Sequence, residues 1–236
     1  TFRYEPPDPE TIYEPIRTTL VICGFNHIYT NSLQSIKEAS LSGKHPVSMI
    51  NPLNIEMGSL RTSLLPGLLK AADYNYKHGS KDLRLFELAN VHFKDHAASN
   101  NFYEEKVLSG LIMGSKRLST IHNNDRNEDI FTLKGYLATL FEQKLGMRFE
   151  LKKGEYPGFD LTRNIYLNNR KAGALGRFSK GWMSGMDINL EEVFGFEINL
   201  KSIVRMIRTK KMYKPISNYP KIQRDLNLVM PISQEV

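Results

Sequence analysis

Histidines four residues apart are the first candidates for chemistry in this sequence, because two histidines on successive turns of a helix can bind zinc. His92 and His96 have that spacing. They fall at the end of a segment that alternates like a strand, where side chains four residues apart are too widely separated to converge on one ion. The sequence offers no obvious third ligand. We therefore predict no metal site.

Adjacent acidic residues are the second candidates, because general acid–base catalysis often uses two carboxylates. Glu104 and Glu105 are neighbours, and so are Glu191 and Glu192. Neighbours in a strand point to opposite faces of a sheet, which does not bring two carboxylates to one substrate. Gly181–Gly185 lacks a central serine and misses the nucleophile-elbow pattern. The sequence also has no phosphate-binding glycine loop and no dinucleotide fingerprint, so residue spacing predicts no active site.

The composition excludes several protein classes. The single cysteine, Cys23, allows neither an internal disulfide nor a thiolate metal cluster, and it fits a reducing cytoplasm. No stretch approaches the ~20 apolar residues of a membrane span, and Thr1–Asp8 lacks the apolar centre of a signal peptide. We expect a cytoplasmic domain without membrane association. Because the chain does not begin with methionine, we also expect it to be a piece of a longer polypeptide.

The net charge of +7 comes from one segment of the chain. Between Lys201 and Arg224 the sequence has eight basic residues and no acidic one, which leaves 24 basic against 25 acidic residues elsewhere. Such a stripe suits contact with a phosphate backbone, although a solvated linker would have the same composition. A short helix over Lys201–Met212 would place three of these side chains on one face: Lys201, Arg205 and Arg208.

Helical periodicity predicts three further helices. The first should begin just before Pro15, because a proline inside a helix removes a backbone hydrogen bond. It should end at Gly24, which can adopt a left-handed conformation. The helices are expected from about Pro15 to Gly24, from an N-cap at Thr62 or Ser63 to about Lys77, and over Asp129–Leu145.

Alternation of apolar residues predicts the strands. Leu83–Phe93 is the clearest, and its two largely apolar faces indicate a central strand. Residues 34–46 should form a polar connection and Asn51–Asn54 a turn, and Asn168 with Asn169 predicts a hairpin turn. We therefore predict an α+β fold, a mostly antiparallel sheet flanked by helices. The other strands are expected at Phe25–Leu33, Val47–Ile50, Val107–Met113, Met147–Leu151, Asn164–Leu167, Ala172–Phe178 and Val193–Leu200.

Seven runs of residues occur together in the order of one known family. They are Asn51–Leu69, Tyr74–Asn75, Asp82–Leu88, Leu133–Gly135, Tyr156–Gly158, Gly195–Ile198 and Tyr219–Val229. In these runs the chain resembles the bacterial phenylalanyl-tRNA synthetase β chain. The last run resembles the start of that family's ferredoxin-like anticodon-binding domain. A match spanning nearly the whole chain is more specific than any single motif.

The resemblance implies a class II synthetase-like fold without the active site, which belongs to the family's α chain. Residues 1–212 would be this noncatalytic core, and residues 213–236 would be a linker and the start of the anticodon-binding domain. Two α and two β chains would assemble, and tRNA(Phe) would be a further partner. ATP and magnesium would be bound mainly by the α chain, and no cofactor by this fragment.

Two arginines of catalytic class II enzymes are missing from the matching stretches. The arginine that contacts the ATP α-phosphate has no counterpart in Leu85–Asp95. Neither Gly173–Gly176 nor Gly185–Asp187 has the Asp-Arg or Glu-Arg ending whose arginine stacks on adenine. Without these cations nothing would offset the developing phosphate charge. Two segments also depart from the family pattern. They are Phe159–Thr162, in place of a basic residue, serine and alanine, and Gly181–Asp187, in place of a His-Pro-Glu helix start.

The resemblance also nominates residues for an interface. We expect the helix before Gly24 and the helix of residues 63–78 near the α chain, although both could simply cover the sheet. Arg61 lies between a turn and a helix start, so we expect it to hold that junction by hydrogen bonds or an ion pair. The candidates for a subunit interface or structural junction are Asn51, Pro52, Arg61 and Thr62.

Two other hypotheses concern function. The first is a tRNA-backbone-binding module that acts through residues 201–224. The other, weaker one is a self-sufficient enzyme whose site is not recognised. The tRNA-backbone candidates are Lys201, Arg205, Arg208, Lys210 and Lys211.

Overall fold

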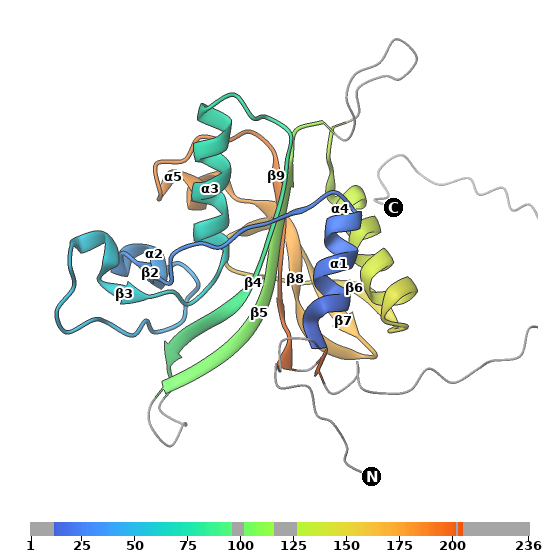
Figure 1. The fold of residues 1–236 in the computed structure, drawn as a ribbon, viewed down its shortest axis with the longest axis horizontal. Coiled ribbons are helices and arrows are strands. Elements are labelled where there is room, and N and C mark those ends of the chain that lie inside the picture. The colour runs from blue at the N-terminus through green and yellow to red at the C-terminus, as the bar shows by residue number, and fades with distance from the viewer. Residues whose placement is uncertain (1–11, 96–101, 116–126, 202, 205–236) are drawn as a thin grey trace, which may run out of the picture.

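A seven-stranded sheet with helices on both faces and a small lobe at one side makes up the fold (Figure 1). The computed structural model describes residues 12–95, 102–115, 127–201 and 203–204. Its helices are α1 (Glu14–Ile22), α2 (Ile36–Ser40), the 3₁₀ turn η2 (Ile55–Met57), α3 (Leu65–Lys77), α4 (Ile130–Ala138), the π-helical η3 (Thr139–Lys144) and α5 (Lys180–Ser184). Its strands are β1 (Asn26–His27), β2 (Leu33–Gln34), β3 (Ser59–Leu60), β4 (Leu83–Lys94), β5 (Phe102–Met113), β6 (Phe149–Lys153), β7 (Phe159–Leu167), β8 (Arg170–Phe178) and β9 (Val193–Asn199).

The large sheet has the strand order β1-β4-β5-β9-β8-β7-β6. Every neighbouring pair is antiparallel except β1 with β4. This arrangement confirms the predicted α+β fold with a mostly antiparallel sheet. The expectation that the strand at 83–93 is central needs a correction. β4 pairs along its whole length with β5, but on its other side it pairs with β1 only at Leu85 and Phe86.

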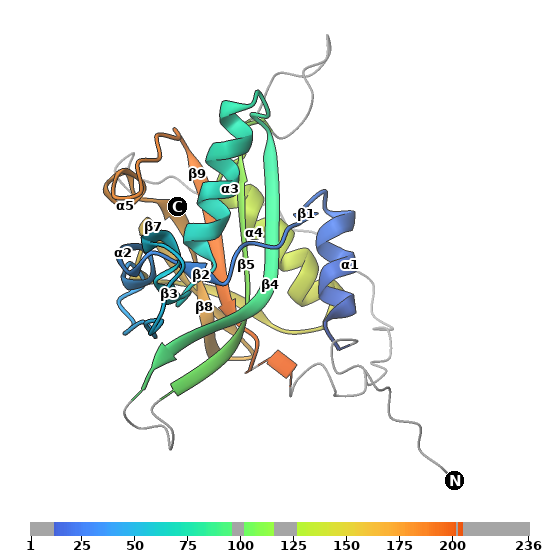
Figure 2. The ribbon, with the colours of Figure 1, turned by 60° about the vertical axis from the view of Figure 1, so that its left-hand side comes forward.

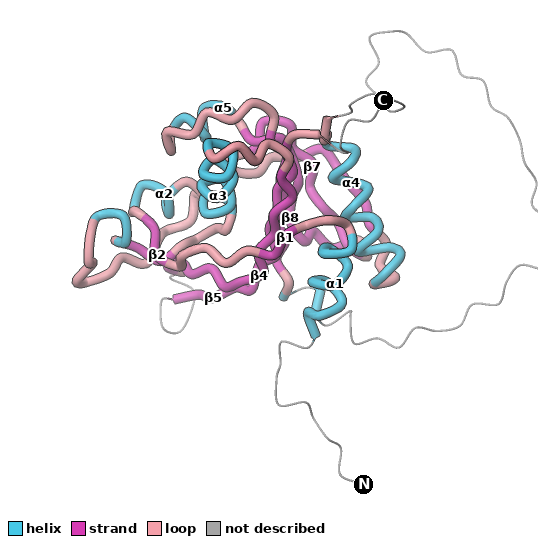
Figure 3. The backbone as a smooth tube through the Cα atoms, turned by 45° about the horizontal axis from the view of Figure 1, so that its top comes forward, coloured by secondary structure: helices cyan, strands magenta, loops and turns pink. Residues whose placement is uncertain are grey.

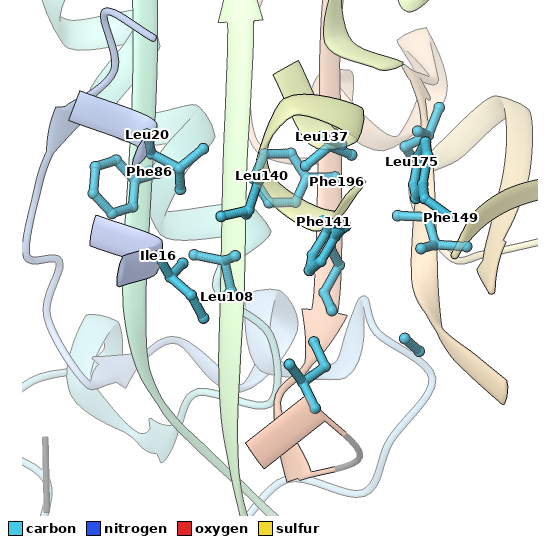
Figure 4. Close-up of a cluster of buried hydrophobic side chains, with 14 of the residues drawn as sticks. Ile16, Leu20, Phe86, Leu108, Leu137, Leu140, Phe141, Phe149, Leu175 and Phe196 are labelled. Carbon is cyan, nitrogen blue, oxygen red and sulfur yellow. The ribbon is translucent and has the colours of Figure 1, made fainter. Parts of the chain in front are cut away.

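Apolar side chains are buried on both faces of the sheet, as the sequence of β4 indicated. Helices α1 and α4 cover one face and α3 covers the other (Figures 2 and 3). On the first face Ile16 and Leu20 of α1 and Phe141 of η3 pack with Phe86 and Phe196 of the sheet (Figure 4). On the second face the buried side chains of α3 pack against strands β4 and β5: Leu65, Leu68, Leu69 and Ala72.

Residues 25–60 differ from the prediction. The strand expected at 25–33 shortens to β1, and the expected polar connection contains α2, whose N-cap Ser35 accepts a hydrogen bond from the Glu38 amide. The strand expected at 47–50 is reduced to an isolated bridge between Ser48 and Ser59. Strands of two residues carry too little alternation to be recognised. Residues 33–60, with β2, α2, η2 and β3, form the small lobe.

Several local predictions agree closely with the structure. The helix expected over Asp129–Leu145 is present as α4, which continues into η3. The structure adds that Asp129 caps α4 by accepting a hydrogen bond from the Thr132 amide. Asn168 and Asn169 have φ of 48° and 66°, the left-handed values that a two-residue hairpin between β7 and β8 requires. α3 begins at Leu65, slightly later than expected. Among the described residues no helix is long and apolar enough to cross a membrane.

Glycines in the sheet leave room for aromatic rings of the neighbouring strand. Gly110 of β5 lies opposite Phe196 of β9. A Cβ at Gly110 would lie 2.6 Å from the Phe196 ring and 2.9 Å from the Leu85 carbonyl oxygen. The absence of a side chain at Gly110 therefore allows the buried Phe196 ring to pack closely against β5.

Replacing Gly110 with alanine should destabilise the chain by about 1–3 kcal/mol, because the ring or the backbone must move to admit the methyl group. Gly135→Ala is the matched control. Gly135 lies exposed inside α4 with no atom within 4 Å of the added Cβ, so it should gain about 0.5–1 kcal/mol. Urea unfolding of both variants measures this, and equal effects would contradict the packing argument.

Candidate functional site

Three polar side chains form a buried row across the middle of the sheet, on the face that α3 covers. Glu87 of β4 pairs in register with Ser109 of β5, and Ser109 pairs with Glu197 of β9. The three residues are 1%, 0% and 4% exposed. Buried carboxylates need hydrogen-bond donors. Residues 61–64, which lead from β3 into α3, supply three of them, and Thr30, Ser109 and Tyr156 supply the others.

Arg61 and Thr30 supply the donors for Glu87. Its guanidinium donates to Glu87 Oε1 at 2.8 Å, to the Asn90 carbonyl at 3.0 Å and to Thr30. The Thr30 hydroxyl in turn donates to Glu87 Oε2 at 2.7 Å. Arg61 is 4% exposed, and its backbone also bonds to Ser32 and His92. The ion pair thus joins three separate segments of the chain at the junction where we expected Arg61 to act.

Glu197 receives four hydrogen bonds and holds the start of α3. Its Oε2 accepts from the Ser63 hydroxyl at 2.8 Å, the Leu64 amide at 3.0 Å and the Ser109 hydroxyl at 2.8 Å. Its Oε1 accepts from the Tyr156 hydroxyl at 2.8 Å. A carboxylate at a helix N-terminus is also favoured by the helix dipole. Burial, with the charge of Glu197 beside it, raises the pKa of Tyr156 well above its ordinary value.

A row of aromatic rings, which we call the aromatic stack although its Phe159–Phe178 contact is edge-to-face, begins at Tyr156 beside Glu197. The ring centroids of Tyr156 and Phe159 are 5.8 Å apart, those of Phe159 and Phe178 4.9 Å, and those of Phe178 and Trp182 5.9 Å. Gly158 has φ of +90°, and a Cβ at this position would lie 3.1 Å from the Trp182 ring. The two segments that depart from the resembled family therefore meet in one packed group.

The row of Glu87, Ser109 and Glu197, together with Arg61, stabilises the fold and is not accessible to a substrate. Both carboxylates of the row and the Arg61 guanidinium are buried, and their hydrogen bonds go to groups of this chain. Groups that must bind a phosphate or a reacting atom have to be accessible. No group of three His, Cys, Asp or Glu among the described residues is placed to hold a metal ion.

The four junction candidates do not form one cluster. Asn51 and Pro52 are exposed on the outer loop of the lobe, whereas Arg61 and Thr62 are buried at its base. The Thr62 hydroxyl donates to the Ala39 carbonyl and lies 2.7 Å from the Ser42 hydroxyl, which ties α2 to the junction. A role of these four residues in a subunit interface stays a prediction.

The basic candidates fall mostly outside the described residues. Lys201 is exposed, and its ammonium contacts the Tyr103 hydroxyl and ring. Residues 201, 203 and 204 are helical, which agrees with the start of the expected basic helix. The other candidates and the domain boundary at residue 212 lie beyond the described part of the chain, as does His96. They are Arg205, Arg208, Lys210 and Lys211.

Sequence reasoning missed both carboxylates of the row. A signal was present, because Glu87 and Glu197 each interrupt an apolar strand, and a charged residue in such a strand must find a partner inside the protein. The identity of the donors was not accessible, since Ser63 and Tyr156 are far from Glu197 in the sequence.

Comparison with known proteins gives consistent results. The family model described as the phenylalanyl-tRNA synthetase β chain CLM domain matches residues 4–200. The chain is similar to phenylalanine–tRNA ligase β subunits of Listeria innocua (32% identity, 94% of this chain) and Thermotoga maritima (29% identity, 88% of this chain). It is 28% identical to that of Chlorobaculum tepidum over 94% of its length. The chain spans 28%, 26% and 29% of these relatives, respectively.

Replacing Arg61 with alanine should destabilise the chain by about 3–5 kcal/mol, because Glu87 would stay buried without its partner. Arg177→Ala is the control. Its pair with Asp160 is partly exposed and should contribute at most about 1 kcal/mol. In a double-mutant cycle, R61A with E87Q should cost less than the sum of the two single changes. Additive effects in urea unfolding would mean that the pair is not coupled.

Replacing Tyr156 with phenylalanine should cost about 1.5–3 kcal/mol at pH 8, because the bond to Glu197 is lost while the ring stays. The raised pKa sets the pH dependence. The folded phenol keeps its proton above about pH 10, where the unfolded phenol loses it. The wild type therefore loses this contribution as pH rises, and the stability difference from Tyr156→Phe should shrink above about pH 10. A constant difference from pH 8 to about pH 11 would rule out this account.

Proposed function

This chain belongs to the family of the phenylalanyl-tRNA synthetase β chain, and from that premise we propose that it is the noncatalytic synthetase-like core of such a subunit. Its task is to pack on a catalytic α chain and so support the joining of phenylalanine to tRNA(Phe) in the cytoplasm. The chain spans about a quarter of the length of its relatives, so the activity of the whole enzyme is part of the proposal.

The main support for the proposal is that the buried polar groups of the sheet bond to other groups of this chain and are not accessible to a substrate. An adenylate-forming site needs arginines that contact ATP phosphates and the adenine ring. The two arginines of the resembled catalytic enzymes are missing from the matching stretches of the sequence. Arg61 is buried, and its guanidinium donates hydrogen bonds to Glu87, Thr30 and the Asn90 carbonyl. On the same sheet face, Tyr156 and the aromatic stack occupy the space beside Glu197.

In this proposal ATP and magnesium are bound mainly by the α chain. The described residues offer no metal-binding group of three ligands, and the two buried carboxylates already accept hydrogen bonds from this chain. In this proposal these residues take no part in the catalytic step. The reaction is assigned to the partner chain, and this chain contributes a rigid surface against which the partner is held.

Exposed apolar side chains support the packing role. Val21 and Ile22 at the end of α1 are 54% and 80% exposed, and Tyr74 on α3 is 63% exposed. Both helices were expected near the interface from the sequence. Apolar side chains at the surface of helices that are otherwise well packed are typical of surfaces that become buried in a complex.

The proposal predicts two biochemical results. The full-length β chain should co-elute with the α chain in size-exclusion chromatography, and the assembled enzyme should catalyse phenylalanine-dependent ATP–pyrophosphate exchange. The 236-residue chain alone should give no exchange above the background without protein. Exchange by the isolated chain would show that it holds an active site. Failure of full-length β to co-elute with α would contradict the proposal that this chain packs on the α chain.

A further inference from the structure

Two adjoining cavities lie where the central strands of the sheet meet the start of α4. Strand β5 ends there between the starts of β4 and β9 (Figure 1). The first cavity, of about 780 Å³, lies beside α4, and the second, of about 410 Å³, lies beside the end of α3. Asn127, Glu128 and Glu192 line both cavities. We call the two cavities together the carboxylate groove.

Acidic side chains predominate in the lining of the carboxylate groove. Lys81 is its one basic residue among those described, and the acidic residues are Asp82, Glu128, Asp129, Glu191 and Glu192. Arg84 pairs with Glu128, and the Arg177 guanidinium lies 3.8 Å from Glu192. The remaining acidic residues of the groove form no ion pair within the described part of the chain. The groove therefore favours a ligand that carries positive charge.

The buried carboxylate of Glu128 is an independent reason to expect a cationic ligand. Glu128 is 3% exposed, and its Oε1 accepts a hydrogen bond from Arg84 Nε at 2.6 Å. Its Oε2 is buried and has no hydrogen-bond partner among the described residues. A buried carboxylate oxygen without a donor is costly. Because Glu128 lies in the wall between the two cavities, an ammonium group that enters from either side would supply the missing donor.

Aromatic rings complete a surface that suits an alkylammonium ion. Tyr76 of α3 lines the second cavity, and Phe131 and Tyr136 of α4 line the first. The face of an aromatic ring attracts a cation, and the Tyr136 ring centroid already lies 5.3 Å from the guanidinium carbon of Arg84. Phe131 is 69% exposed, so its ring is available to a ligand. Carboxylates and aromatic rings together match ammonium groups that are joined by methylenes.

The lining argues against other classes of ligand. A divalent metal ion requires several oxygen ligands that converge on one point, and no group of three His, Cys, Asp or Glu among the described residues does so. Nucleic acid would require several cations facing its phosphates, and the described lining offers only Lys81. Cavities of these volumes are of the size that holds small molecules. Two cavities that meet at Glu128 fit a linear ligand with charges spaced along it.

We propose that the carboxylate groove binds a linear alkyl polyamine, with one ammonium group beside Glu128 and another beside Glu191 and Glu192. The methylene chain between these groups packs against the aromatic rings of the lining. The site is separate from the buried row of Glu87 and Glu197, and it does not depend on packing against an α chain. A bound polyamine stabilises the junction of the sheet with α4, because a ligand that binds only the folded state raises its stability.

The test measures the binding of spermidine to the full-length β chain, without tRNA, by calorimetry at constant ionic strength. Glu191→Gln combined with Glu192→Gln should weaken binding about five- to tenfold, because each exposed carboxylate contributes modestly. Glu142→Gln combined with Glu155→Gln is the matched control, since both residues are exposed and lie outside the groove, and it should stay within about twofold of wild type. Both double variants should keep the wild-type unfolding midpoint, because the replaced side chains are exposed.

Glu128→Gln tests the buried anchor. Its amide nitrogen donates where the carboxylate oxygen accepted, so binding should weaken at least about tenfold. The unfolding midpoint of this variant reports whether loss of the pair with Arg84 disturbs the fold. If the midpoint falls, the double variant at Glu191 and Glu192 decides alone.

Hydrogen exchange locates the ligand without a substitution. The amides of residues 127–136 should exchange more slowly when spermidine is bound, and protection confined to other segments would overturn the inference. It is also wrong if wild-type β binds no spermidine at about 1 mM, although the proposed packing on an α chain would stand. Equal weakening by the control variant would show a general charge effect. Tighter binding of a trilysine peptide, lost in the same variants, would make the groove a protein-docking surface instead.

Discussion

The burial of two carboxylates in one row of the sheet is the constraint on which the rest of the structure depends. Glu87 and Glu197 lie in register on either side of Ser109. Because a buried carboxylate without donors is very costly, residues 61–64 must lie across the sheet at this level. α3 begins directly afterwards, so the same hydrogen bonds place its apolar side on β4 and β5. One half of the core is thereby coupled to the polar row.

The polar row also accounts for the ionisable side chains buried on this face of the sheet. The face of the sheet that carries Glu87 and Glu197 is closed by α3 and by the stack of Tyr156, Phe159, Phe178 and Trp182. Groups that could otherwise serve catalysis are used to hold the fold.

The lobe differs from this buried face, because hydrogen bonds hold its base while apolar side chains are exposed on its outer loop. Its base is tied down by Arg61, Thr62 and Trp182, whose indole donates to the Leu41 carbonyl at 3.3 Å. Its outer loop presents isoleucine and leucine to solvent.

The sequence by itself determined the family, the α+β class, the strand at Leu83–Phe93, the helix that begins after Asp129 and the Asn168–Asn169 hairpin, since each of these depends on neighbouring residues or on a pattern along the chain. Only the tertiary structure decided which partners meet. Arg61 and Glu87 are 26 residues apart and Ser63 and Glu197 are 134 apart, and strand register brings them together. Exposure was undetermined for the same reason. Ile50, Leu53 and Ile55 have the composition of core residues, and whether an apolar side chain is buried depends on which distant segments fold over it.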